Sequence, residues 1–231
     1  MLPLTTIVPL PFMSCIGKII LTAPNELVDI SKVANNIANI VANYFKENLS
    51  KAMVQFYKSI DFDKYPEYFG LKYHNYAFKS ACIWETMHMM SSDNLFWLDA
   101  GCGIKNELKA IRILLRVFGF YSPFSSTSVG DLTYPAVLNE FDPMGANGFG
   151  KKRMLSGGVV GLNIRNNDAT QIIREWHQLT YRQDLLAPEG SNRDNHRQDQ
   201  SLLSLVYYSR KRNVPILERR YYEFMVHLNK R

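Results

Sequence analysis

The chain has 231 residues, of which 46% are hydrophobic, 21% are charged and 13% are aromatic. This length and composition are sufficient for a sizeable buried core, and they exclude a disordered, collagen-like or coiled-coil chain. The net charge of +6 is uneven: residues 1–100 hold 8 Lys and Arg against 9 Asp and Glu, and residues 101–231 hold 19 against 12. An anionic ligand would therefore be drawn to the second half, although a solvated basic face gives the same pattern.

Other classes of partner are not predicted. The basic residues are spread out and form no nucleic-acid-binding motif, so we expect no nucleic acid partner. Prolines at positions 3, 9 and 11 interrupt the most apolar stretch, residues 1–23, so no transmembrane helix is expected. The three cysteines are too few and too scattered for a disulfide framework or a zinc site. The composition is compatible with the cytoplasm and with a Golgi-type lumen.

The first half of the chain alternates between strand and helix patterns. Residues 18–23 predict a buried strand, 27–45 a helix with apolar residues at helical spacing, and 52–57 a second strand. A polar loop follows, and then residues 76–90 predict a helix, 95–98 a short apolar strand, and 105–118 a helix with strong periodicity. Because strands alternate with helices, the pattern predicts a mainly parallel, Rossmann-like central sheet flanked by helices. A continuous apolar run such as 95–98 is typical of an interior strand of such a sheet.

The second half begins with a loop-dominated stretch, 121–150, which is rich in Ser, Pro and Gly. Residues 157–163 predict a strand entered through a glycine pair, and 168–182 a helix capped by Asp168 or Asn167. A polar loop at 185–195 precedes a helix at 199–212, and 214–217 predict a last edge strand. We expect one domain over residues 1–231, with an N-terminal extension at 1–17 and a basic C-terminal tail at 213–231.

Asp99 is the most informative single residue, because it follows the predicted strand 95–98. In open α/β sheets, ligands bind beyond the carboxyl ends of the strands, so this carboxylate is expected in a ligand crevice unless it only caps the next turn. The segment Leu98-Asp-Ala-Gly-Cys-Gly103 also looks like the first glycine motif of S-adenosylmethionine-dependent methyltransferases. Lys105 stands where that motif has its last glycine, and such short motifs have a high false-positive rate.

A second group of polar residues is His196-Arg-Gln-Asp-Gln200, at the start of an apolar helix. Helix N-termini favour anions, and His196 and Asp199 lie three residues apart, so they can share a helix face. The same residues also suit a charged N-terminal turn that only stabilises the helix. We expect His196 and Asp199 to face the same cleft as Asp99.

Six segments occur in a suggestive order: Tyr76-Ala-Phe-Lys79, Leu95-Phe-Trp-Leu-Asp-Ala-Gly101, Ser156-Gly-Gly158, Trp176, Ala187-Pro-Glu-Gly-Ser191 and His196-Arg-Gln-Asp-Gln-Ser201. This series resembles a group of poorly characterised glycosyltransferase-like proteins with the nucleotide-diphospho-sugar (GT-A) fold. The resemblance covers roughly residues 52–210. It implies a GT-A-like α/β domain that transfers a sugar from a nucleotide-sugar donor to a glycan, protein or small-molecule acceptor.

The resemblance also implies residue roles. Asp99 would be the first carboxylate of an Asp-x-Asp motif and would hold Mn²⁺ or Mg²⁺ alone or with His196, because Gly101 stands at the position of the second carboxylate. The chemistry of the helix start adds Asp199 as the catalytic residue, which would contact the hydroxyls of the sugar or serve as the acid/base group. Donor binding would fall to Asp99, Lys79, Gly157, Gly158, Arg197 and Gln200.

Each role has a structural alternative. Lys79 would contact the diphosphate or be an ordinary exposed lysine, and the glycine pair would admit the donor or form a tight turn. Trp84, Trp97 and Trp176 are expected in the core rather than as sugar platforms. Two other functions stay open: the methyltransferase, and a degenerate binding protein that keeps the fold without turnover, which Gly101 favours.

Overall fold

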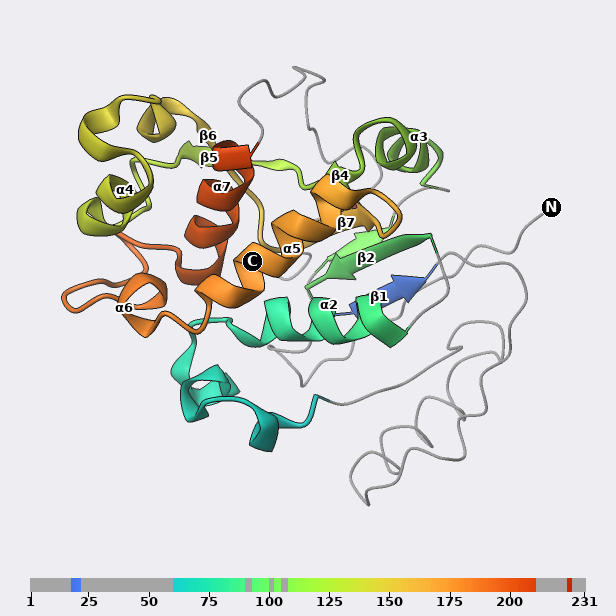
Figure 1. Cartoon of the computed structure of the whole chain (residues 1–231), viewed down its shortest axis with the longest axis horizontal. Helices are drawn as coiled ribbons and strands as arrows, with labels where there is room; N and C mark the ends of the chain where they lie inside the picture. The colour runs from blue at the N-terminus through green and yellow to red at the C-terminus, as the bar shows by residue number, and fades with distance from the viewer. Residues whose placement is uncertain are drawn as a thin grey trace.

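The computed structural model describes residues 18–21, 60–89, 93–99, 102–104, 108–210 and 224–225, and they form a mixed α/β structure (Figure 1). The strands are β1 (Lys18–Leu21), β2 (Asn94–Leu98), β3 (Gly103–Ile104), β4 (Phe120–Tyr121), β5 (Phe124–Ser128), β6 (Arg153–Leu155), β7 (Val159–Asn163) and β8 (Phe224–Met225). The α-helices are α2 (Phe78–Met89), α3 (Lys109–Phe118), α4 (Pro135–Phe141), α5 (Asn167–Leu179), α6 (Gln183–Leu186) and α7 (Gln198–Arg210). Short 3-10 helices occupy Phe62–Lys64, Glu67–Phe69, Leu71–Tyr73, Pro143–Gly145 and Phe149–Lys151.

The largest described sheet has four strands in the order β1-β2-β7-β4, so β2 is an interior strand, as the sequence predicted. Strand direction differs from the prediction. Strand β2 pairs antiparallel with β1 and with β7, and β4 also pairs antiparallel with β7. Two further pairs, β3 with β8 and β5 with β6, are antiparallel as well. The described strands therefore form small antiparallel sheets and not the mainly parallel sheet that the apolar run suggested.

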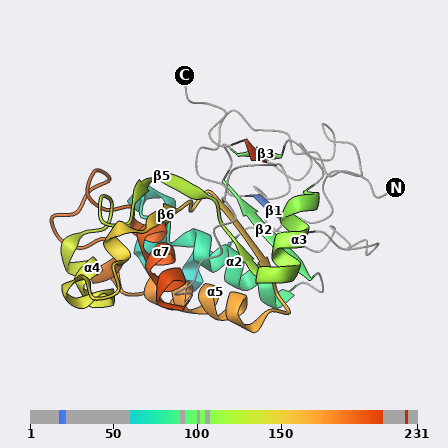
Figure 2. The ribbon, with the colours of Figure 1, turned by 90° about the horizontal axis from the view of Figure 1, so that it is seen from above.

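The apolar run of β2 is explained by burial on both faces. Leu95 and Trp97 belong to the main hydrophobic core, whereas Phe96 and Leu98 belong to a second cluster that includes Ile111 of α3. Helices α2, α5 and α7 contribute to the main core, and α3 lies on the other side of β2 (Figure 2). A continuous apolar run indicates that both faces of the strand are covered. It does not distinguish a parallel from an antiparallel neighbouring strand.

The cross-strand pair Phe96 and Gly161 shows how closely β2 and β7 pack. The two residues are directly opposite in the register. A Cβ atom built on Gly161 would lie 2.8 Å from Cε1 of the Phe96 ring, so the ring occupies the space that any side chain at 161 would need. Glycine in a strand often marks such a close approach.

Most of the predicted elements within the described residues are confirmed, with shifted ends: α2, β2, α3, β7, α5 and α7. The cap of α5 is Asn166, whose side chain accepts from the Ala169 N–H, and not Asp168 or Asn167. The stretch 121–150, predicted as loop-dominated, contains β5 and α4. The strand predicted at 18–23 is present as β1, while the elements predicted at 27–45, 52–57 and 214–217 lie outside the described residues.

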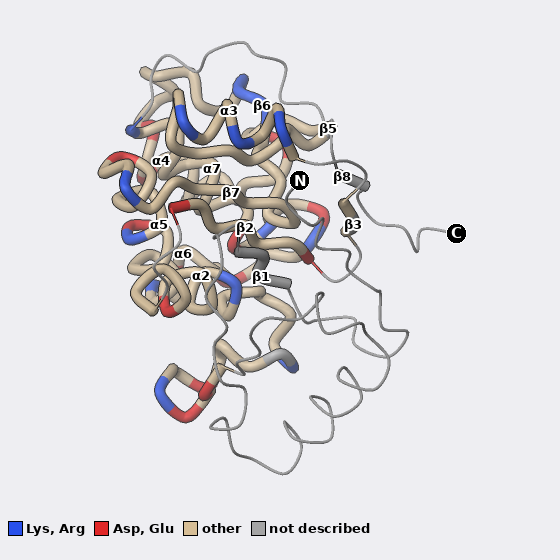
Figure 3. Tube along the Cα trace, turned by 90° about the vertical axis from the view of Figure 1, so that its right-hand side faces the viewer, with Lys and Arg blue, Asp and Glu red and all other residues tan. Residues whose placement is uncertain are grey.

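Some of the positive charge expected in the second half lies on α3, where Lys109, Arg112 and Arg116 are exposed (Figure 3). None of the helices that the structure describes has the length and apolar character that a membrane span requires.

Candidate functional site

Three charged side chains from separate elements meet at the carboxyl end of β2. Lys79 is on the first turn of α2, Asp99 directly follows β2, and Asp199 is on the first turn of α7. The Lys79 Nζ atom lies 2.9 Å from Asp99 Oδ2 and 3.8 Å from Asp199 Oδ2. One ammonium group therefore joins two carboxylates that are distant in the sequence, and we call Lys79, Asp99 and Asp199 the charged cluster.

The charged cluster is largely hidden from water. The Lys79 and Asp199 side chains are 8% and 3% exposed, while the Asp99 side chain is 26% exposed. Lys79 is thus not the ordinary exposed lysine that the sequence also allowed. Since a buried charge is costly unless it is paired, the ion pairs explain how this lysine is accommodated.

The glycine pair forms one wall of the cluster. A Cβ atom on Gly157 would lie 3.3 Å from Asp199 Oδ2, and a Cβ atom on Gly158 would lie 3.2 Å from Asp99 Oδ2. Gly157 also offers its carbonyl oxygen to Lys79 Nζ at 3.5 Å, and the Asp99 N–H donates to the Gly158 carbonyl at 2.9 Å. The backbone between β6 and β7 therefore approaches both carboxylates closely because these two residues lack side chains.

Burial and neighbouring charges shift the pKa values of Asp199 and Lys79. Burial raises the pKa of Asp199 to about 7; nearby Asp99 adds to the rise, and Lys79 opposes it. For Lys79, burial alone would lower the pKa, but Asp199 and Asp99 outweigh it and the pKa lies above its usual value. A carboxyl group with a pKa near neutrality can both accept and donate a proton at physiological pH.

The raised pKa of Asp199 predicts a pH dependence of stability. In the unfolded chain an aspartate ionises near a pKa of about 3.9, whereas in the folded chain Asp199 holds its proton up to about pH 7. Between these values the folded state binds more protons, so this group lowers the free energy of unfolding as the pH rises, and the loss is complete above the folded pKa. We therefore expect Asp199→Asn to gain stability relative to the wild type from about pH 4 to about pH 8, measured by chemical denaturation.

The comparison with the variant is needed because a second group acts in the opposite direction. Burial lowers the pKa of His177 to about 4, so His177 makes the protein more stable as the pH rises over the same interval. The difference between the variant and the wild type cancels this contribution. A flat difference profile would contradict a protonated Asp199.

Two further residues at the site were not identified from the sequence as functional. The Tyr76 ring lies 4.8 Å from Lys79 Nζ and 5.2 Å from the Arg193 guanidinium carbon, and Arg193 donates to the Tyr76 hydroxyl. Tyr76 has a positive φ of 62°, which is uncommon for a residue with a side chain and often marks a functional segment. Arg193 also lowers the pKa of Asp199, so its positive charge acts on the same cluster.

Trp97 combines a core position with a contact to the site. Its ring is 2% exposed, as predicted for a core residue, and its Nε1–H donates to Asp99 Oδ1 at 2.9 Å. Trp176 is also fully buried, whereas Trp84 is half-buried. The sequence signal for the Trp97 contact was its position two residues before Asp99, on the same side of the strand.

The segment His196–Ser201 divides between two roles. His196 is fully buried, its Nδ1 accepts from the Tyr134 N–H, and its Nε2 lies 3.0 Å from the Leu185 carbonyl oxygen. Because Nδ1 accepts, the ring proton is on Nε2, and burial lowers the His196 pKa and keeps the ring neutral. His196 thus ties together segments next to α4, α6 and α7, and the structure does not place it in contact with Asp99.

The other members of this segment are placed as follows. Ser201 donates to the Leu132 carbonyl at 2.7 Å, and the Arg197 N–H donates to the same carbonyl, so both hold the loop before α4. Gln200 donates to the Leu155 carbonyl at 2.7 Å and its Cβ atom lies beside Gly157, so Gln200 borders the charged cluster. Of the predicted donor-binding residues, the structure brings together Lys79, Asp99, Gly157, Gly158 and Gln200 with Asp199, the residue predicted to be catalytic, and it does not bring in Arg197.

The arrangement does not fit a divalent cation between Asp99 and His196. Asp99 Oδ1 accepts from Trp97 and Oδ2 accepts from Lys79, while both nitrogens of His196 have backbone partners. Within the described residues no group of three or more His, Cys, Asp and Glu side chains is suited to hold a metal ion. The ligand atoms that the resemblance implies are already occupied by protein groups.

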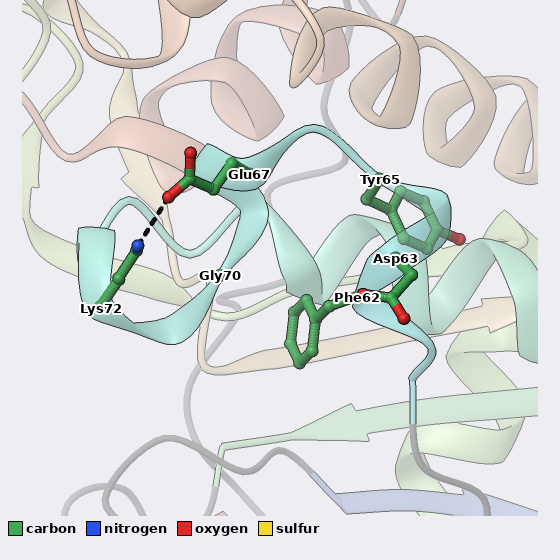
Figure 4. A pocket seen from close by; sticks show the side chains of 6 residues that line it. All are labelled: Phe62, Asp63, Tyr65, Glu67, Gly70 and Lys72. Carbon is green, nitrogen blue, oxygen red and sulfur yellow. Dashed lines mark hydrogen bonds and ion pairs between the residues drawn. The ribbon is translucent and has the colours of Figure 1, made fainter.

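Two surface hollows lie away from the charged cluster. One, of about 660 Å³, is lined by Phe62, Asp63, Tyr65, Glu67, Gly70 and Lys72, and the Lys72–Glu67 ion pair lies at its edge (Figure 4). The other, of about 390 Å³, is lined by residues that include Trp84, Glu85 and His177. None of the predicted site residues lines either hollow.

Comparisons of the chain with protein-family models, with curated proteins and with solved structures gave no match.

Proposed function

We propose that the protein is a glycosyltransferase, an enzyme that moves a sugar from a nucleotide-sugar donor to a glycan, protein or small-molecule acceptor. One observation supports the proposal above all others: a single ammonium group, that of Lys79, joins Asp99 to Asp199 beside Gly157 and Gly158. These five residues come from four separate segments, and all four segments belong to the resemblance. A GT-A-like arrangement of the domain is part of the same proposal.

The proposed donor site combines positive charge with an open backbone. The departing nucleoside diphosphate is an anion, and exposed Arg193 contacts the same Tyr76 ring that Lys79 contacts. Guanidinium groups suit phosphate oxygens because they donate two hydrogen bonds in a fixed geometry. Asp99, the most exposed of the three charged groups, is the one accessible to the hydroxyls of the sugar.

Asp199 is proposed as the acid/base group. It has a pKa of about 7, and its Oδ2 atom is buried without a hydrogen-bond partner. A proton acceptor with this pKa is matched to the removal of a proton from an acceptor hydroxyl near neutral pH. The position of the carboxyl on the first turn of α7 keeps it in place, since α7 is anchored in the core.

The test uses Asp199→Asn, which keeps the shape and removes the acid. We expect release of nucleoside diphosphate from UDP- or GDP-sugars to fall by about a hundredfold or more, the scale of a lost acid/base group. Folding at pH 7 should be retained, as shown by thermal unfolding. Asp184→Asn is the matched control, because Asp184 is an exposed aspartate on α6 that pairs with Arg182. Unchanged turnover in Asp199→Asn would contradict the proposed role.

Two alternatives are separated by ligand binding. In the glycine segment that suggested a methyltransferase, Asp99 is held by Trp97 and Lys79, and Gly103 begins the short strand β3. A binding protein without turnover is favoured by the full pairing of both Asp99 oxygens. A native-state ligand raises the melting temperature, so a thermal shift with S-adenosylmethionine and none with nucleotide sugars would support the methyltransferase. Binding of nucleotide sugars without any turnover would support the binding protein.

A further inference from the structure

The surroundings of the Lys79 ammonium resemble those of a metal cation. Its nearest oxygens are Asp99 Oδ2 at 2.9 Å, the Gly157 carbonyl at 3.5 Å and Asp199 Oδ2 at 3.8 Å. Carboxylate and carbonyl oxygens are the ligands that hard divalent cations such as Mg²⁺ and Mn²⁺ prefer. The three oxygens come from three separate segments and face one buried position, which the ammonium fills.

When Asp199 is ionised, the charge at this position is incompletely balanced. Two carboxylates share one ammonium group, and Asp199 Oδ2 has an ion pair at 3.8 Å but no hydrogen bond. The remaining negative charge is the kind that a doubly charged ion would neutralise. The protein instead fixes a single positive charge there, on a side chain held in place by α2.

We propose that the ammonium group of Lys79 occupies the position of a divalent cation, so that the protein carries its own fixed cation and the site is closed to metal until Lys79 is removed. This inference deepens the proposed function, since the fixed charge would then replace the metal as the partner of the donor. The statement about the cation position itself depends only on the oxygens around Lys79. Metal binding therefore tests the cation position without any measurement of sugar transfer.

The experiment compares metal binding by the wild type and by Lys79→Ala. MnCl₂ and MgCl₂ alone are the probes, followed by calorimetric titration and by thermal unfolding. We expect no saturable binding by the wild type. We expect Lys79→Ala, which leaves the oxygens and adds space, to bind Mn²⁺ and to gain about 10 °C or less in melting temperature when the ion is in about hundredfold excess over its dissociation constant.

Two controls locate the bound ion. Lys79→Ala/Asp99→Asn lacks one charged ligand and should lose most of the gained affinity. Lys72→Ala removes an exposed lysine that pairs with Glu67 alone, so it should bind Mn²⁺ no better than the wild type does. Binding by Lys72→Ala equal to that by Lys79→Ala would overturn the proposal.

Measurements on proteins that keep Lys79 can also overturn the inference. If the wild type binds Mn²⁺ and Asp99→Asn abolishes that binding, Lys79 does not close the site. If Lys79→Ala does not fold in metal-free buffer, refolding with Mn²⁺ should recover it, and failure to do so counts against the proposal. A third outcome is that the wild type binds no metal, Lys79→Ala binds it, and no sugar transfer is found under any condition. This outcome would support the fixed cation and contradict the proposed function.

Discussion

Replacing Lys79 with methionine is expected to lower the free energy of unfolding by about 3–5 kcal/mol, the cost of removing one partner from a buried ion pair. Methionine is similar in length to the lysine stem, so the volume changes little. The substitution removes the positive charge between Asp99 and Asp199. The two carboxyl groups then face each other in a region with little access to water. Equilibrium denaturation with urea at pH 8, above the wild-type Asp199 pKa of about 7, measures the effect.

The triple variant Lys79→Met/Asp99→Asn/Asp199→Asn separates charge from shape. Since replacing a whole buried charge network is often tolerated, we expect this variant to be more stable than Lys79→Met alone. Lys72→Met is the control for loss of an exposed ion pair and should be much milder than Lys79→Met. If Lys79→Met were as mild as Lys72→Met, Lys79 would not be the charge that holds the two carboxylates.

Trp176→Ala is expected to cost about 3–5 kcal/mol, the range for deleting a buried aromatic side chain. Trp176 is fully buried on α5 in the main core, where α5 packs on α7. Its Nε1–H donates to the carbonyl of Asp199 at 2.9 Å, so the ring also fixes the first turn of α7. The measurement is chemical denaturation, with nucleotide-sugar binding as a second readout.

Trp176→Phe separates the packing from the hydrogen bond. It keeps most of the apolar volume and leaves the Asp199 carbonyl without this donor, which predicts a cost of about 1–3 kcal/mol. If the bond positions Asp199, turnover in Trp176→Phe should fall further than stability explains. Turnover per folded molecule equal to that of the wild type would assign Trp176 to packing alone.

The location of the site was predictable from local patterns. The apolar run before Asp99 placed that carboxylate at the end of an interior strand, and the polar start of an apolar helix placed Asp199 on the first turn of α7. Such signals are local because burial and helix termini leave periodic or positional traces in the sequence. The shared cleft of Asp99 and Asp199 was expected because helix starts can border the crevice at strand ends, whereas the place of Lys79 between them was suggested only by the resemblance.

Other features had no signal in the sequence. The described strands do not show the predicted parallel sheet: β2 is covered on both faces, and an antiparallel strand buried in this way has the same apolar run as a parallel one. His196 was expected to bind metal because imidazole beside a carboxylate is a common ligand pair, yet two backbone groups use its nitrogens. Arg193 lies in a polar loop without periodicity, and only the tertiary structure brings it onto the Tyr76 ring.

The separation of Lys79 from its partners has a consequence for the order of folding. Lys79 and Asp99 are 20 residues apart, and Lys79 and Gly157 are 78 residues apart, so the cluster forms only after long loops have closed. Contacts that close long loops lose chain entropy before they gain interaction energy, and they tend to form late. A late-forming contact stabilises the native state mainly by slowing unfolding. The charged cluster would then affect the unfolding rate, and with it the lifetime of the folded protein, more than it affects the folding rate.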